Sequence, residues 1–130
     1  MKFNYLIQKS VKLNREINDK SKQFRHFSFI LDGNKIISVG QNDKDKTHTL
    51  AFKNGYKYSC IHSELDALVR AKIDVERFKK CTIVNVRLNR FNHVNLSRPC
   101  MNCQNLLKHY KFKKIYYTNE NGRFEEYKYK

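Results

Sequence analysis

Two short motifs, far apart in the sequence, constrain the fold of this chain more than any other feature. The first is His62-Ser63-Glu64, and the second is Pro99-Cys100-x-x-Cys103. An imidazole and two thiolates are common metal ligands, and the Cys-x-x-Cys spacing lets one turn of the chain present both sulfur atoms to one ion. The two motifs can form a single site only if the fold brings their segments together.

One histidine and two cysteines are a ligand set typical of zinc. Structural zinc sites have four protein ligands, whereas catalytic sites have three and leave a fourth position for water. Zinc lowers the pKa of such a water toward about 7, and a carboxylate beside it can carry the released proton. The motifs therefore predict a catalytic centre with His62, Cys100 and Cys103 as zinc ligands and Glu64 as the proton carrier.

Two other uses of these motifs compete with a catalytic centre. A structural zinc site would need a fourth protein ligand, which Cys60, Cys81 or His109 could supply. A thioredoxin-like redox pair would use only the two cysteines of the second motif. Neither alternative gives Glu64 a role, and the redox pair leaves His62 unexplained, so the catalytic centre is favoured.

Length and composition fit one soluble domain over residues 1–130. The 130 residues can bury a core, and 40% of them are hydrophobic. The first residues contain no apolar run typical of a signal peptide, and no segment is apolar enough to span a membrane. We therefore expect a cytoplasmic protein with no membrane partner. Its four cysteines indicate metal or redox chemistry rather than disulfides, with Cys60 and Cys81 expected to be buried thiols rather than ligands.

The chain carries a formal net charge of +15, which would suit a polyanion such as a nucleic acid. The positive residues are spread along the chain rather than gathered in one tail. A composition rich in Lys, Asn, Tyr and Phe also explains the charge without any partner. Nucleic-acid binding is therefore one open alternative.

The order of predicted elements favours a mixed sheet with helices packed on its faces. Apolar residues at helical spacing predict helices at 3–17, 64–73 and 100–110. Apolar and alternating runs predict strands at 26–31, 35–39, 81–88, 115–118 and 124–129, with hairpin turns at Asp32-Gly33 and Asn121-Gly122. Residues 41–59 and 89–99 are expected to be loops, and both motifs then fall at helix starts, where the helix dipole favours thiolates.

From about His26 to Thr118 the chain resembles the zinc-dependent cytidine/deoxycytidylate deaminase superfamily, through the His-x-Glu and Pro-Cys-x-x-Cys motifs. The resemblance implies a three-layer α/β/α fold with a mixed five-stranded sheet and helices on both faces. It also implies that His62, Cys100 and Cys103 bind zinc and that Glu64 is the general acid and base. By the same resemblance the substrate would be contacted by Asn42, Ser63 and His48.

The resemblance places the chain between branches of this superfamily. Ser63 stands where alanine is usual, at a position whose backbone N–H holds the carbonyl group of the base. The Asn121-Gly122 hairpin is similar to free-cytidine deaminases, yet those typically have Cys where this chain has His62. A helix between the last two strands, found in deoxycytidylate, tRNA-adenosine and APOBEC-type enzymes, is not expected here.

The leading hypothesis is a hydrolytic deaminase that converts a cytosine-type base to a uracil-type base with release of ammonia. Its substrate would be a free nucleoside or nucleotide such as (deoxy)cytidine or its monophosphate. One alternative acts on cytosine or adenine in single-stranded DNA or RNA, and another is an inactive, zinc-stabilised nucleic-acid-binding module. The resemblance also implies a homo-oligomer, because members of the superfamily often complete each other's pockets.

Overall fold

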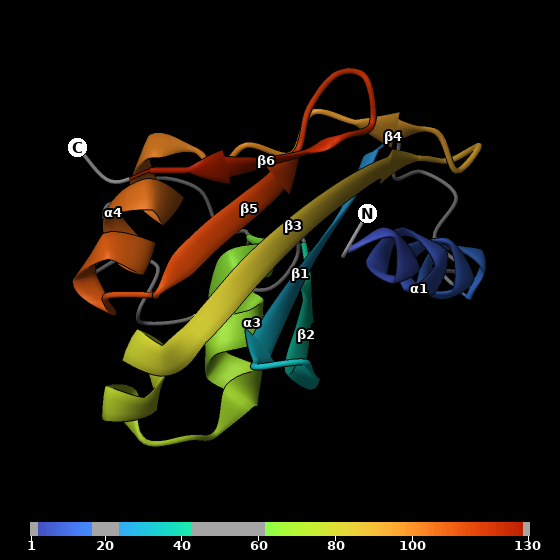
Figure 1. Cartoon of the computed structure of the whole chain (residues 1–130). Helices are drawn as coiled ribbons and strands as arrows, with labels where there is room; N and C mark the ends of the chain where they lie inside the picture. Colours follow the sequence, from blue (N-terminus) through green and yellow to red (C-terminus); the bar gives the residue numbers. More distant parts are fainter. Residues whose placement is uncertain (1–2, 17–23, 43–61, 129–130) are drawn as a thin grey trace.

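A mixed β-sheet forms the middle of the structure (Figure 1), a computed structural model that describes residues 3–16, 24–42 and 62–128. Its strands follow the order β2-β1-β3-β5-β6, and the short β4 pairs with β3 outside this path. Only β3 and β5 are parallel, and the other pairs are antiparallel. The strands are β1 (Phe24–Asp32), β2 (Lys35–Gln41), β3 (Cys81–Asn89), β4 (Val94–Asn95), β5 (Lys114–Thr118) and β6 (Phe124–Tyr127).

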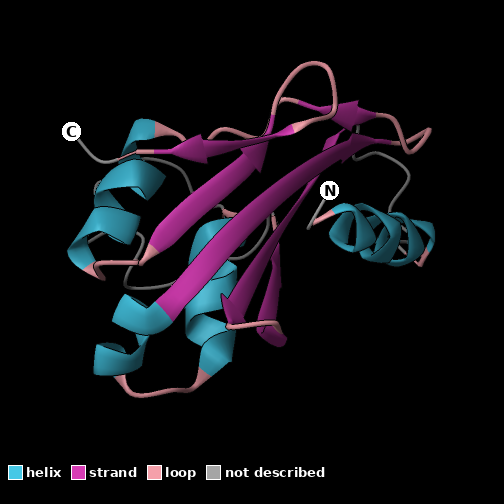
Figure 2. Ribbon diagram, viewed as in Figure 1, coloured by secondary structure: helices cyan, strands magenta, loops and turns pink. Residues whose placement is uncertain are grey.

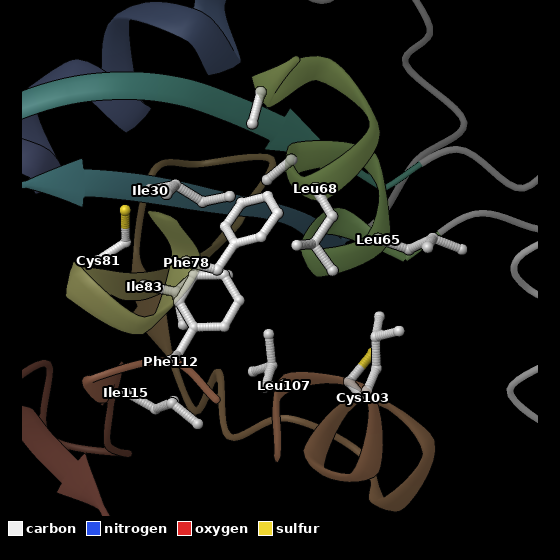
Figure 3. Packing of buried hydrophobic residues seen from close by; sticks show 13 residues of the cluster. Ile30, Leu65, Leu68, Phe78, Cys81, Ile83, Cys103, Leu107, Phe112 and Ile115 are labelled. Atoms are coloured by element: carbon white, nitrogen blue, oxygen red, sulfur yellow. The ribbon is translucent and has the colours of Figure 1, made fainter. Parts of the chain in front are cut away.

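Helices cover both faces of the sheet, which confirms the predicted three layers (Figure 2). The helix α1 (Asn4–Arg15) packs on one face, and α3 (Ser63–Ala71), the 3-10 helix η1 (Val75–Lys80) and α4 (Met101–His109) pack on the other. Alternation along β1 divides the core accordingly. Phe27, Phe29 and Leu31 belong to the cluster under α1, whereas Ile30 belongs to the cluster under α3 and α4 (Figure 3).

Most predicted elements are confirmed, with changed ends. The first helix ends at Arg15, and residue 17 lies outside the described residues. The helix predicted at 64–73 begins at Ser63, within the first motif. It ends at Ala71, because Lys72 adopts a left-handed conformation with φ 50°. The final strand ends at Tyr127 rather than at residue 129.

The two predicted hairpins also form. Asp32 pairs with Lys35, so the two-residue loop is Gly33-Asn34 rather than Asp32-Gly33. Gly33 has φ +62°, a conformation that glycine adopts without strain. Thr118 pairs with Phe124, so the loop around Asn121-Gly122 is longer than two residues.

Two elements were not predicted. The stretch 89–99, expected to be a loop, contains β4, which turns back on β3, so that the described residues form six strands rather than the predicted five. The 3-10 helix η1 lies between α3 and β3. The predicted loop at 41–59 lies outside the described residues from residue 43 onward. Among the described helices, none is long and apolar enough to cross a membrane, and the cytoplasmic location stays a prediction.

The first helix is anchored to β1 and β3 by polar groups. Asn14 donates from Nδ2 to the carbonyl oxygen of Asn89 at 3.1 Å, and its Oδ1 accepts from the buried guanidinium of Arg25 at 2.7 Å. Phe3 and Leu6 bury their side chains against the sheet on the same side. These contacts fix α1 without placing it near either motif.

The helix α3 lies unusually close to β2. A Cβ atom added at Gly40 would lie 2.8 Å from the Cα of Ala67 and closer still to backbone atoms of Ser63 and Ala67. On the same strand the hydroxyl of Ser38 donates to the carbonyl oxygen of Ala67 at 2.7 Å. The backbone N–H of Gln41 donates to Asp66 at 2.9 Å. Only glycine permits this approach, which sets the position of the helix that begins the first motif.

Replacing Gly40 with alanine should therefore push α3 away from β2. We expect Gly40→Ala to lower the free energy of unfolding by about 1–3 kcal/mol or more, as overpacking does, and to weaken zinc binding by about tenfold or more. Denaturant unfolding and a competitive zinc titration measure the two effects.

The control is Gly33→Ala, where nothing lies within 4 Å of the added Cβ but φ is +62°. It should lose about 1–2 kcal/mol of stability because of the left-handed backbone and keep its zinc affinity. Unchanged stability and zinc affinity in Gly40→Ala would contradict the close packing described here.

Candidate metal centre and its buried carboxylate

The first motif is placed by the start of α3. His62 is the residue before the helix, with extended backbone (φ −80°, ψ 154°), and its carbonyl oxygen accepts from the N–H of Asp66 at 3.0 Å. Glu64 lies in the first turn and is buried against the sheet. The imidazole is thus left half-exposed at the end of the helix, while the carboxyl group points into the protein.

The second motif is placed by the start of α4. Cys100 precedes the helix with extended backbone (φ −65°, ψ 167°), and its sulfur accepts from the N–H of Cys103 at 3.5 Å. The approach to this turn is held by buried Ser97, whose N–H donates to the carbonyl oxygen of Thr118 at 2.9 Å and whose hydroxyl donates to that of Asn85 at 2.9 Å. Strands β3 and β5 therefore fix the start of α4.

The two motifs meet. Nδ1 of His62 lies 3.6 Å from Sγ of Cys100 and 3.5 Å from Sγ of Cys103. All three ligand atoms lie within 4.8 Å of one another. A tetrahedral zinc ion with bonds of about 2.3 Å to sulfur and about 2.0–2.1 Å to nitrogen requires S···N separations of about 3.6 Å. The residues present therefore fit zinc.

The charges of these groups favour metal binding. The pKa of Cys100 is lowered to about 4, first by the hydrogen bond with the Cys103 side chain and then, against the effect of burial, by hydrogen bonds with His62 and with the Cys103 backbone. The pKa of His62 is raised, chiefly by its hydrogen bond with Cys100. The hydrogen bond between His62 and Cys100 thus favours the thiolate, which is the form of cysteine that binds a metal ion.

No fourth protein ligand joins this group among the described residues. Cys81 lies at the start of β3, where its thiol donates to the carbonyl oxygen of Arg77. His109 is the last residue of α4, and the cysteines lie at that helix's start. Cys60 lies outside the described residues. Neither described candidate supports the structural-zinc alternative, and no disulfide joins the two motif cysteines.

Glu64 has the properties of a proton carrier. Its side chain is buried with 5% relative exposure, and burial is the main cause that raises its pKa. Oε2 accepts from Nδ2 of Asn85 at 3.0 Å, and Oε1 accepts from the hydroxyl of Ser63 at 3.1 Å. A raised pKa helps a carboxyl group both to accept and to donate a proton.

The structure describes two of the three residues that were predicted to contact the substrate. The Ser63 side chain is buried and points toward Ser28, with the hydroxyl oxygens 2.8 Å apart, so its predicted contact would have to come from its backbone N–H in the first turn of α3. Asn42 follows β2, and its Oδ1 accepts from the N–H of His26 at 2.9 Å. His48 lies outside the described residues. The roles of all three at a substrate stay predictions.

Sequence reasoning missed three residues at this site. Asn85 and Ser28 contact the Glu64 network, and the pKa of His26 is lowered to about 4 by burial first, with further effects of Arg87 and His62. The signal for Asn85 and Ser28 was a polar residue inside an otherwise apolar strand. His26 gave no such signal, because it stands near the end of its strand.

Comparison with known proteins agrees with this geometry. The family model described as "Cytidine and deoxycytidylate deaminase zinc-binding region" matches residues 1–119. The dCMP deaminase from the cyanophage S-TIM5 in apo form has a similar fold, with TM-score 0.53, 19% identity, and coverage of 88% of this chain and 79% of that one. The same enzyme in complex with dCMP and dUMP gives TM-score 0.57, 18% identity, and coverage of 89% and 79%. Curated protein sequences give no match.

The lowered pKa of Cys100 predicts unusual reactivity in metal-free protein. Because the thiolate is the nucleophile, alkylation of Cys100 by iodoacetamide should stay fast as the pH falls and decline only near pH 4. Added zinc should protect the thiol. Peptide mapping by mass spectrometry measures the rate at each pH.

Cys81 is the internal comparison, because burial raises the pKa of its thiol and it should react slowly throughout. The proposed site would be contradicted if the alkylation rate of Cys100 already declined as the pH was lowered below 8. It would also be contradicted if added zinc left that rate unchanged.

Proposed function

Because the chain belongs to the cytidine and deoxycytidylate deaminase family, we propose that it is a zinc-dependent hydrolytic deaminase of a free cytosine nucleotide or nucleoside. The reaction would consume water, convert the cytosine-type base to a uracil-type base and release ammonia. The substrate class proposed is (deoxy)cytidine or its monophosphate. The fold neighbour that binds dCMP and dUMP supports a nucleotide.

One observation carries this proposal. The three ligand atoms of His62, Cys100 and Cys103 lie at the separations that a zinc ion requires. The buried Glu64 lies in the first turn of α3, two residues after His62. Among the described residues no fourth protein ligand fills the remaining position. A structural zinc site would need neither the open position nor the carboxyl group.

Zinc bound by these three residues would supply a water molecule that loses its proton near neutral pH. Glu64 would take a proton from that water and deliver it to N3 of the base, and it would then carry a second proton, from the hydroxyl group added at C4, to the amino group, which leaves as ammonia. Its burial favours this two-way role, because burial raises the pKa of the carboxyl group, and a carboxyl group with a low pKa would not hold the proton that it must return. The backbone N–H of Ser63 would hold the carbonyl group of the base, and Asn42 and His48 would contact the rest of the substrate.

A nucleic-acid substrate is the second candidate. The net charge of +15 suits a polyanion. Phe91, in the turn between β3 and β4, is 65% exposed, and the guanidinium of Arg90 lies 5.1 Å from the centre of its ring. An exposed aromatic ring beside a cation can stack on a base of a single strand.

A homo-oligomer stays a prediction, which a measurement of the protein's mass in solution tests.

The Glu64→Gln variant should lose turnover by about 100- to 10,000-fold, because the amide cannot carry a proton, while it retains one zinc ion per chain. Ammonia release and metal analysis measure these two properties. The matched control is Glu76→Gln, an exposed glutamate paired with Lys79, which should keep full activity. Full activity in folded Glu64→Gln would contradict the proposed mechanism.

A panel of substrates separates the two candidates. Cytidine, deoxycytidine, their monophosphates and single-stranded DNA and RNA oligonucleotides are tested side by side against Glu64→Gln protein. We expect ammonia release from at least one free nucleoside or nucleotide. Release from oligonucleotides alone, with binding that weakens steeply as salt rises, would contradict the free-nucleotide assignment and favour the nucleic-acid substrate.

A further inference from the structure

Four buried polar side chains form a closed ring of polar contacts beside the metal ligands. Ser28 lies on β1, Asn85 lies on β3, and Ser63 and Glu64 begin α3. The amide of Asn85 donates to Oε2 of Glu64 at 3.0 Å, and its Oδ1 accepts from the hydroxyl of Ser28 at 2.7 Å. The hydroxyl oxygens of Ser28 and Ser63 lie 2.8 Å apart, and Ser63 donates to Oε1 of Glu64 at 3.1 Å.

The ring holds both carboxyl oxygens of Glu64 from opposite sides. Oε2 is bound through Asn85 and Oε1 through Ser63, so rotation of the carboxyl group about its last bond would break a hydrogen bond at each end. The orientation of the Asn85 amide is itself fixed. Its Nδ2 also donates to the carbonyl oxygen of Ser97 at 3.3 Å, which leaves Oδ1 to accept from Ser28.

Packing alone does not require these polar groups. Ser28 and Asn85 pair directly across β1 and β3, and the next pair on the same face is Ile30 with Ile83. All four side chains are buried, with relative exposures of 0% for Ser28 and 2% for Asn85. Buried polar groups destabilise a fold unless every partner is present, so an apolar pair would serve the core as well.

We propose that Ser28 and Asn85 are positioning residues that, together with Ser63, hold the carboxyl group of Glu64 in the orientation needed for proton transfer. This inference rests on the proposed function. Asn85 acts directly on the carboxyl group, and Ser28 acts through Asn85 and Ser63. Neither contacts His62, Cys100 or Cys103 in a hydrogen bond that the structure shows.

Ser28→Ala is the cleanest test, because it removes one hydroxyl and leaves the backbone and the metal ligands in place. Asn85→Asp keeps the size of the side chain and an acceptor for Ser28, but it replaces the donor to Glu64 with a second carboxylate. We expect kcat to fall by about 10- to 100-fold in both variants with KM little changed and one zinc ion per chain retained.

The matched control is Ser10→Ala. Ser10 is also a buried serine, but its hydroxyl donates to the carbonyl oxygen of Leu6 within α1 and not to the ring. Its loss should affect thermal stability to a similar degree as Ser28→Ala while kcat stays at the wild-type value. A purely structural role for Ser28 would make the two variants alike in kcat.

Crystal structures of the zinc-loaded variants provide a readout that needs no activity. The Glu64 carboxyl group should shift or occupy more than one conformation in Ser28→Ala and Asn85→Asp, and it should stay in place in Ser10→Ala. An unmoved carboxyl group, or a moved one with wild-type kcat, overturns the positioning role. A wild-type protein that releases no ammonia from any cytosine substrate overturns the proposed function instead, and the carboxyl position still decides whether the ring positions Glu64.

Discussion

The approach of α3 to β2 at Gly40 is the packing contact on which the site depends. Without a side chain at this position, the backbone of Ser63 and Ala67 can lie against the strand, and the hydrogen bonds from Ser38 and Gln41 then fix the helix along its length. That placement sets His62 and Glu64 together, since both lie at the start of the helix. The parallel pair β3 and β5 sets the start of α4 independently, through Ser97.

Two helix starts therefore meet at one end of the sheet, and each contributes different chemistry. One contributes an imidazole that can be half-exposed and a carboxyl group that is buried. The other contributes two sulfur atoms from a single turn, and hydrogen bonds with Cys103 and His62 lower the pKa of the Cys100 thiol. His62 and Glu64 are only two residues apart, yet His62 is partly exposed and Glu64 is buried.

Local patterns in the sequence predicted the elements that depend on local chemistry. The alternation of Phe27, Phe29 and Leu31 predicted a strand and its buried face, and the glycines near residues 33 and 122 predicted the hairpins. The two motifs predicted the ligand set because metal-binding residues must be specific in kind and spacing. The short strand β4 was missed because two residues carry no periodicity. The Ser28–Asn85 pair was missed because its meaning depends on the register between β1 and β3, which no local pattern reveals.

The central claim is that three protein ligands hold zinc and leave one position open beside Glu64. X-ray absorption at the zinc edge tests it directly in solution. The account predicts two sulfur neighbours at about 2.3 Å and two lighter neighbours at about 2.0–2.1 Å, one of them an imidazole nitrogen. A spectrum with three or four sulfur neighbours, or a purified protein that binds no zinc, would contradict the account.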